Sequence, residues 1–172
     1  MSSKFKDNFQ DHDWRTLQFS SMWVFAGVAG VDGKISKKER KRFFKLLSHS
    51  PALRGDLVRE VMMSVFMDLE GVFSAFSEDE RKVQEGLPAV AGVLSEHASN
   101  DEAVMFKSSL LNMGLEVAGA DGPVFGSNVS EAESAGLTWI QNWLGLDDAE
   151  AERVMQRYAP GSGQEELPGN YL

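Results

Sequence analysis

A short pattern of small residues followed by Asp-Gly occurs twice in this sequence, and it restricts the fold more than any other feature. The first copy is VAGVDGKISKKE (residues 28–39) and the second is VAGADGPVFGSNVSEAE (residues 117–133). In each copy a Ser follows the Asp-Gly, with a Glu three positions later. Asp-Gly favours a turn, and Ser-x-x-Glu is typical of the first turn of a helix. Each copy therefore predicts a helix, a turn and a second helix.

The two copies also align beyond the turn. Residues 22–33 align with residues 111–122, and residues 35–39 align with residues 129–133 after an insertion of five residues. This similarity indicates an internal duplication of a helix-turn-helix unit. Neither unit has enough apolar surface to fold alone, so we expect the two hairpins to pack together.

Apolar residues recur with helical spacing along most of the chain, and no run alternates between apolar and polar residues as a half-buried strand would. The sequence predicts an all-α fold, a compact bundle of about seven helices. The expected helices are residues 13–31, 37–49, 51–69, 78–97, 101–119, 131–145 and 148–158. We expect a flexible N-terminus over residues 1–12, a single domain over residues 13–159 and a disordered tail over residues 160–172.

Small residues favour a close approach between the helices that precede the two turns. The first helix contains Gly27 and Gly30, and the second contains Gly114. A Gly inside a helix costs about 1 kcal/mol relative to Ala, so close packing must compensate for it. We expect these helices to cross in the core, which would bring Asp32 and Asp121 to the same end of the bundle.

The composition excludes several classes of functional site. The chain of 172 residues has no Cys, and its three His are scattered, so disulfides, thiolate zinc sites and a Cys nucleophile are excluded. It contains no Gly-rich phosphate loop and no nucleophile elbow, which favours a binding module over an enzyme. The longest uncharged run, residues 16–31, is shorter than the roughly 20 residues of a membrane span. We expect a cytoplasmic protein without a transmembrane segment, with peripheral membrane attachment as an open alternative.

Charge is distributed unevenly along the chain. The net charge is −9, but residues 1–60 contain 12 Lys and Arg against 7 Asp and Glu, while residues 61–172 contain 5 against 19. The overall acidity argues against nucleic-acid binding, which needs a basic surface. Opposite charge at the two ends of the sequence leaves self-association into a homo-oligomer open.

The positive charge is concentrated in one predicted helix. Seven of the twelve residues over 34–45 are Lys or Arg, and Phe43, Phe44 and the neighbouring leucines are expected to form its inward face. Such a helix can be merely solvated, or it can dock on an acidic protein or on anionic membrane headgroups. The predicted partner-binding residues are Lys37, Lys38, Lys41 and Lys45.

Aromatic and sulfur-containing side chains are expected to fill the core. Trp139 and Trp143 are four residues apart on one helix face, and Met62, Met63 and Met67 fall in a strongly apolar segment. This spacing is more typical of core packing than of a ligand-binding cage.

Asp32 and Asp121 each follow the end of a predicted helix, where free carbonyl oxygens make the negative pole of the helix dipole. A carboxylate is mildly unfavourable there, and a bound cation would relieve the repulsion. Carboxylate and carbonyl oxygens are the donors that calcium, magnesium and manganese prefer. Together with Glu39 and Glu133, these residues form a candidate site for a divalent cation.

A purely structural interpretation of the two turns is also open. Ser77-x-x-Glu80 and Asp147-x-x-Glu150 have the same capping form but do not follow an Asp-Gly. A Glu at this spacing can therefore have a purely structural role, in which it accepts a hydrogen bond from the amide of the cap residue.

The two turns, each joining two helices of an all-α domain, resemble the paired ADG-x-(I/V)-S-x-x-E turns of the TerB-like tellurite-resistance family over residues 15–157. This sequence departs from that pattern at Val31, where Ala or Ser is usual, and in the five-residue insertion after Gly122. The resemblance implies a non-enzymatic helical module whose acidic turn residues bind a divalent metal in membrane-linked stress responses. Carried over residue by residue, it implies that Asp32, Glu39, Asp121 and Glu133 are the metal ligands. The rival hypothesis is a metal-free scaffold that docks on a protein partner through the basic helix. A metal-dependent hydrolase that uses the same carboxylates is a more distant alternative.

Overall fold

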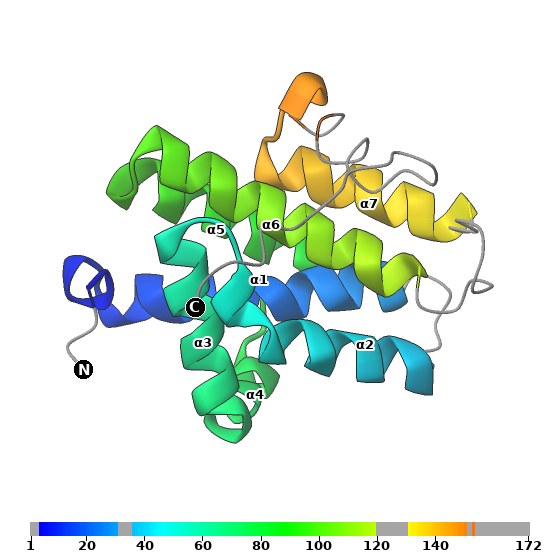
Figure 1. Cartoon of the computed structure of the whole chain (residues 1–172), viewed down its shortest axis with the longest axis horizontal. Coiled ribbons are helices and arrows are strands. Elements are labelled where there is room, and N and C mark those ends of the chain that lie inside the picture. Colours follow the sequence, from blue (N-terminus) through cyan, green and yellow to red (C-terminus); the bar gives the residue numbers. More distant parts are fainter. Residues whose placement is uncertain (1–3, 31–35, 120–130, 151–152, 154–172) are drawn as a thin grey trace.

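The computed structural model describes residues 4–30, 36–119, 131–150 and 153. Seven α-helices and two short 3-10 helices have their full bounds in these ranges, which also include the helical residues 148–150 and 153 and contain no strand. In chain order they are η1 (Lys6–Asn8), α1 (Asp11–Ala29), α2 (Lys37–Ser48), η2 (Ser50–Ala52), α3 (Asp56–Met67), α4 (Leu69–Glu78), α5 (Val83–His97), α6 (Asn100–Ala118) and α7 (Glu131–Leu144). The helices form a bundle (Figure 1), which confirms the predicted all-α fold.

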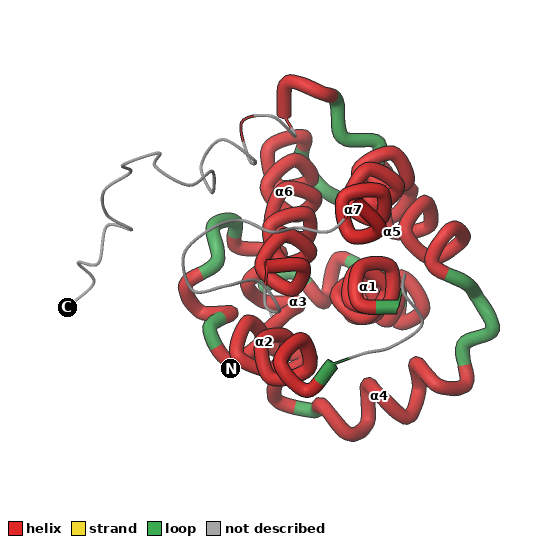
Figure 2. The backbone as a smooth tube through the Cα atoms, turned by 90° about the vertical axis from the view of Figure 1, so that its right-hand side faces the viewer, coloured by secondary structure: helices red, strands yellow, loops and turns green. Residues whose placement is uncertain are grey.

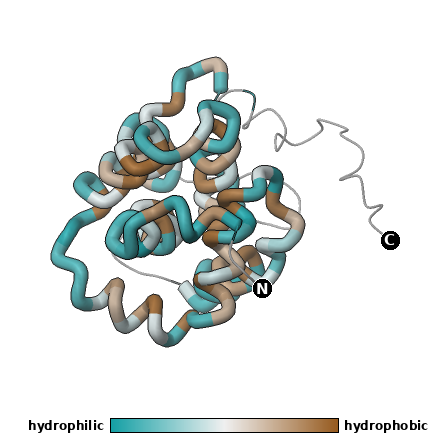
Figure 3. The backbone as a smooth tube through the Cα atoms, turned by 90° about the vertical axis from the view of Figure 1, so that its left-hand side faces the viewer, coloured by the Kyte–Doolittle hydropathy of each residue, from teal (hydrophilic) through white to brown (hydrophobic). Residues whose placement is uncertain are grey.

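Helix α1 occupies the centre of the bundle. It packs against α3, α4, α5, α6 and α7, and Figure 2 shows it end-on with other helices around it. Its buried side chains include Leu17, Trp23 and Val24. Apolar and polar residues are interleaved along the helices (Figure 3), as expected for helices that each bury one face. The core is therefore organised around a single nearly enclosed helix.

The expected crossing of the helices before the two turns occurs between α1 and α6. A Cβ atom added to Gly114 would lie 3.1 Å from Leu137 Cδ2 and 3.2 Å from Val24 Cγ1. A second close approach was not expected from the sequence: a Cβ atom on Gly86 of α5 would overlap the indole ring of Trp23. Small residues thus bring two different helices onto α1.

The two hairpins keep the register of the sequence duplication. Helices α1 and α6 have 19 residues each. The alignment pairs their last residues, and when it is continued back without a gap it also pairs their first residues. After the turn, the alignment pairs the first residue of α2 with the first residue of α7. The C-cap residues Gly30 and Gly119 have nearly the same right-handed backbone conformation. Both copies therefore have first helices of the same extent and second helices that begin at equivalent positions, although α7 is two residues longer than α2.

Several predicted helix boundaries are wrong. The single helix expected over residues 51–69 is interrupted by Gly55, whose φ of +93° is rarely adopted by other residues. The helix expected over residues 78–97 begins only at Val83. Helix α4 was not expected, and it is separated from α3 by Asp68, which has φ −129° and ψ 50°.

The chain before α1 also packs on the bundle. Phe5 and Phe9, in the segment expected to be flexible, contact the core, and the Phe5 amide donates to the two carboxylate oxygens of Glu60 at 3.1 and 3.2 Å. At the other terminus, residues 148–150 and 153 are helical, as expected for the start of the seventh predicted helix. The predicted tail, residues 160–172, lies outside the described residues.

Candidate functional site: the turn end of the bundle

The helix ends that flank the two turns lie at one end of the bundle. Helices α1 and α6 end there, at Gly30 and Gly119, and α2 and α7 begin there (Figures 1 and 2). We call this region the turn end. Two predicted metal ligands, Asp32 and Asp121, lie outside the described residues, and the other two, Glu39 and Glu133, lie in the first turns of α2 and α7.

Glu39 belongs to a reciprocal capping box at the start of α2. Its Oε2 accepts a hydrogen bond from the Ser36 amide at 2.7 Å, and Ser36 Oγ accepts one from the Glu39 amide at 3.0 Å. The Glu39 residue is only 5% exposed. The predicted capping box at Glu39 is confirmed. The cap uses one lone pair of Oε2, so it does not by itself prevent the carboxylate from binding a cation.

Glu133 is the third residue of α7, the position equivalent to Glu39 in α2, and it is half-buried. The N-terminal turn of a helix stabilises a carboxylate through the helix dipole, so both glutamates are favourable there without a cation. Their oxygens also have the hard-donor chemistry that a divalent cation requires. Within the described ranges, no three His, Asp or Glu side chains are arranged to hold a metal ion. The two glutamates fit a cation in donor type, and the complete ligand set remains a prediction.

Similar capping contacts occur elsewhere in the chain. Asp147 Oδ1 accepts from the Glu150 amide at 2.7 Å, which confirms that predicted cap. The cap predicted at Ser77 is wrong, because its hydroxyl donates to a carbonyl of α4 at 2.7 Å. Instead, Glu85 Oε2 accepts from the Lys82 amide at 2.8 Å at the start of α5. Glu85 therefore offers a matched comparison for Glu39, at a cap that follows no Asp-Gly turn.

The family model of the tellurite resistance protein TerB matches residues 18–156. This chain belongs to the TerB family. The match includes both acidic turns, the whole second hairpin and the first hairpin from residue 18 on, so the resemblance carried by the paired turn motifs is confirmed. Comparisons with curated proteins and with solved structures found no match. In the described part of this TerB-family chain, none of the helices combines the length and the apolar character needed to span a membrane.

The predicted partner-binding lysines of this TerB-family chain all lie on the exposed side of α2. We define the basic face as these lysines with the exposed Arg40 and Phe44 between them: Lys37, Lys38, Arg40, Lys41, Phe44 and Lys45. Among the described residues, none of its cations forms an ion pair, whereas Arg42 of the same helix pairs with Glu116 of α6. Arg42 thus holds α2 to the bundle, and the basic face remains turned to solvent.

Phe44 does not lie on the inward face of α2, as the sequence analysis expected. It is 46% exposed, and its ring centroid lies 6.4 Å from that of Phe73. Phe43 and Leu47, four residues apart, supply the inward face, and Phe43 stacks on Phe25 with ring centroids 4.6 Å apart. The basic face therefore combines positive charge with an aromatic ring.

Three side chains assigned to the core are exposed. Trp139 is 50% exposed and lies beside the partly buried Trp143, with ring centroids 6.2 Å apart. Met63 and Met67 are 40% and 81% exposed, whereas Met62 is fully buried as expected. Apolar residues occur on more than one side of α3, so its composition alone did not distinguish the inward side of the helix from the outward side.

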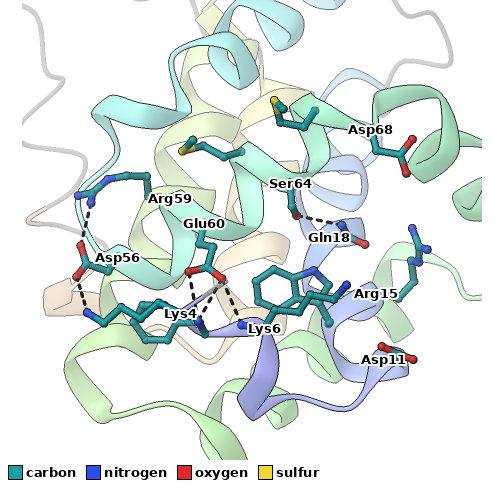
Figure 4. A pocket seen from close by; sticks show the side chains of 14 residues that line it. Lys4, Lys6, Asp11, Arg15, Gln18, Asp56, Arg59, Glu60, Ser64 and Asp68 are labelled. Atoms are coloured by element: carbon teal, nitrogen blue, oxygen red, sulfur yellow. Dashed lines mark hydrogen bonds and ion pairs between the residues drawn. The ribbon is translucent and has the colours of Figure 1, made fainter. Parts of the chain in front are cut away.

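A groove that the sequence analysis did not identify lies between η1, α1 and α3 (Figure 4). It has a volume of about 1200 Å³ and is lined by residues from the N-terminal half of α1, away from the turn end. Charges of both signs line it and partly pair with each other: Asp56 lies 3.5 Å from Lys4 and 2.8 Å from Arg59. Because the charges nearly balance, the groove has no clear preference for a cationic or an anionic ligand.

Arg81 forms an electrostatic clamp between α1 and the α4–α5 connection. Its guanidinium bonds both carboxylate oxygens of Asp79 at 2.7 to 3.1 Å and Thr16 Oγ1 at 3.2 Å. It also lies over the Trp23 ring, 5.0 Å from the centroid. Hydrogen bonds from the Arg81 side chain lower the pKa of Asp79, although burial opposes the shift. The sequence analysis missed this clamp because it assigned the segment to a continuous helix.

Proposed function

We propose that this TerB-family chain is a non-enzymatic binding module that coordinates or senses a divalent cation through its paired acidic turns. Calcium, magnesium and manganese match the oxygen donors involved. The observation that carries the proposal is the convergence of both hairpins at the turn end (Figures 1 and 2). Family membership supports a tellurite-resistance or stress-response context.

The chemistry of the helix ends supports a cation in preference to an anion. Gly30 and Gly119 are the C-caps of α1 and α6, and Asp32 and Asp121 follow each of them by two residues. The negative poles of α1 and α6 and the positive poles of α2 and α7 meet at this end of the bundle. The net negative charge there therefore comes from the four acidic side chains Asp32, Glu39, Asp121 and Glu133. A divalent cation would neutralise this concentration of negative charge.

The test is a titration of the full chain with calcium, magnesium and manganese, followed by calorimetry and thermal melting. A cation that binds only the folded state at 100 times its Kd stabilises that state by about 2.7 kcal/mol, so the melting temperature should rise. Asp32→Asn and Asp121→Asn should abolish both the heat and the melting shift. If both variants bind the cations as the unmodified chain does, the proposal is wrong.

Glu39→Gln separates the ligand role from the structural role. A Gln side chain can still accept the hydrogen bond from the Ser36 amide, so the cap should survive while the negative charge is removed. We expect at least about tenfold weaker cation binding with little change in melting of the cation-free chain. Glu85→Gln makes the same change in the matched cap of α5 and should leave cation binding unchanged.

A second function, a metal-free scaffold, is favoured by the basic face. Its five cations and an aromatic ring turned to solvent suit a cytoplasmic acidic protein partner. Fluorescence anisotropy with a polyglutamate peptide tests this role at low and high salt. Reversing Lys37, Lys38, Lys41 and Lys45 to Glu should abolish binding, while Arg54→Glu with Lys82→Glu, which lie outside α2, should have little effect. Binding to phosphatidylserine vesicles but not to the peptide would instead assign the face to a membrane surface.

A further inference from the structure

Charge is segregated between the second helix of each hairpin. Residues 36–49, which contain α2, have six Lys and Arg and one acidic residue, the buried Glu39. Residues 131–150, which contain α7, have five Asp and Glu and no Lys or Arg. We call the latter range the acidic segment. Two equivalent helices of one duplicated unit have thus acquired opposite charge.

Each of these two regions also exposes an aromatic side chain. Phe44 is 46% exposed on the basic face, and Trp139 is 50% exposed in the acidic segment, where Trp143 lies beside it. Partly exposed aromatic rings are frequent anchors of protein interfaces, and Trp is among the strongest of them. The basic face and the acidic segment are therefore complementary in charge, and both offer apolar anchors.

The two regions belong to different sides of one bundle. Helix α2 packs on α3 and α6, whereas α7 packs on α1, α5 and α6. Figure 2 shows α2 and α7 in end-on view with α1 and α6 between them. The complementary surfaces cannot pair within one folded chain, so only a second copy can bring them together.

We propose that the basic face of one copy binds the acidic segment of a second copy. This inference rests on the docking role proposed for the basic face and names its partner. The contact joins two different surfaces, so a bound pair leaves one acidic segment unoccupied on the first copy and one basic face unoccupied on the second. Association therefore continues beyond a dimer, into a closed ring or an open chain of copies.

Sedimentation velocity of the full chain in a metal chelator tests the proposal. We expect the mean mass to rise with protein concentration at low salt, and the association constant to fall by about tenfold or more when the salt concentration is raised to about 0.5 M. A chain that stays monomeric at every concentration would overturn the inference. If that monomer still binds polyglutamate, the docking role of the basic face survives and only self-association is wrong. If it binds neither polyglutamate nor a second copy, both the docking role and self-association are wrong.

Two complementary variants make the test specific. The first, Lys41→Glu with Lys45→Glu, disables the basic face, and the second, Glu131→Lys with Trp139→Ala, disables the acidic segment. Each variant alone should be monomeric, with an unchanged far-ultraviolet circular dichroism spectrum and a cooperative thermal melt. An equimolar mixture should form a 1:1 complex that grows no further, because only one intact surface remains on each copy.

The outcomes of the mixing experiment decide between modes of association. A mixture that remains monomeric, or single variants that associate as the unmodified chain does, would contradict the proposed pairing. The control variant, Arg54→Glu with Lys82→Glu, changes the net charge as much as the basic-face variant does. It should associate normally, and equal loss of association in this control would attribute the effect to overall charge.

Discussion

The first hairpin (α1 and α2) and the second (α6 and α7) have the same register but differ in what they bury and expose. Their first helices have the same extent and their second helices begin at equivalent positions, and Glu39 and Glu133 occupy the same place in the first turn of the second helix. The helix surfaces differ: Trp23 of α1 is buried under α5, while α6 presents Gly114 to α1. The duplication has preserved the helix ends that flank the two turns, while the helix faces have diverged.

The second helices differ most. Helix α2 buries Glu39, Phe43 and Leu47, and its remaining surface carries the basic face. Helix α7 buries five residues, which are Gly136, Leu137, Ile140, Gln141 and Leu144. Because α2 has fewer buried anchors, each one should matter more to the stability of its hairpin.

The largest expected effect compares equivalent core positions in α2 and α7. Phe43 and Leu137 align in the duplication, and they are 2% and 3% exposed. We expect Phe43→Ala to lower the free energy of unfolding by about 4 kcal/mol and Leu137→Ala by about 3 kcal/mol, since each leaves a cavity. Urea denaturation measures both values. A smaller loss for Phe43→Ala than for Leu137→Ala would contradict the view that α2 depends on fewer anchors.

The next effect concerns how α1 is packed. Gly86→Ala should lower the free energy of unfolding by about 2 to 3 kcal/mol, because the added methyl group overlaps the rigid indole of Trp23. Gly92 lies in the same helix with nothing within 4 Å of the position of its Cβ. Gly92→Ala should therefore raise stability by about 0.5 to 1 kcal/mol through helix propensity alone. Equal effects of the two variants would exclude the close contact between α1 and α5.

Local sequence patterns predicted the helix ends that depend on local caps, and missed several other helix ends and helix faces. The Ser36 and Asp147 caps were recognised because a cap depends on residues a few positions apart. The start of α3 was missed because its Leu57 amide bonds Glu102 of α6 at 3.1 Å, a contact between residues distant in sequence. Contacts of this kind leave no local signal.

The candidate site also has features that follow from local sequence and features that do not. The place of Glu39 in a cap followed directly from its spacing, whereas the exposure of Phe44 and Trp139 did not. Helical periodicity identifies an apolar side of a helix, but it does not reveal where the neighbouring helices stop covering that side. The partner-facing part of the site therefore required the three-dimensional arrangement.

The Arg81 clamp acts on α1 of the first hairpin, and its effect should depend on pH. The lowered pKa of Asp79 means that the clamp contributes its full stability well above the ordinary pKa of 3.8, and that this contribution disappears as the pH falls through the folded-state pKa. At pH 7, Asp79→Asn should lower the free energy of unfolding by about 1 to 2 kcal/mol, since Arg81 is partly exposed. Urea denaturation at several pH values should show this difference shrinking below pH 3.8. A difference that is constant over the whole range would contradict the ionic clamp.

The smallest effect compares the helix caps of the two hairpins. Ser36 caps α2 at 3.0 Å with the reciprocal bond from Glu39, whereas Ser99 caps α6 at a longer 3.3 Å. Ser36→Ala should lower the free energy of unfolding by about 1 kcal/mol, and Ser99→Ala by about half as much, because the longer and more exposed bond is weaker. Chemical denaturation of the cation-free chain measures both changes. Loss of the cap would also free Glu39 to move. If Ser36→Ala weakens cation binding by more than its loss of stability explains, the capping box positions the acidic turn for the cation. Unchanged cation affinity in a destabilised Ser36→Ala chain would show that the cap does not position the cation ligands, and Glu39→Gln would then decide whether Glu39 is one of them.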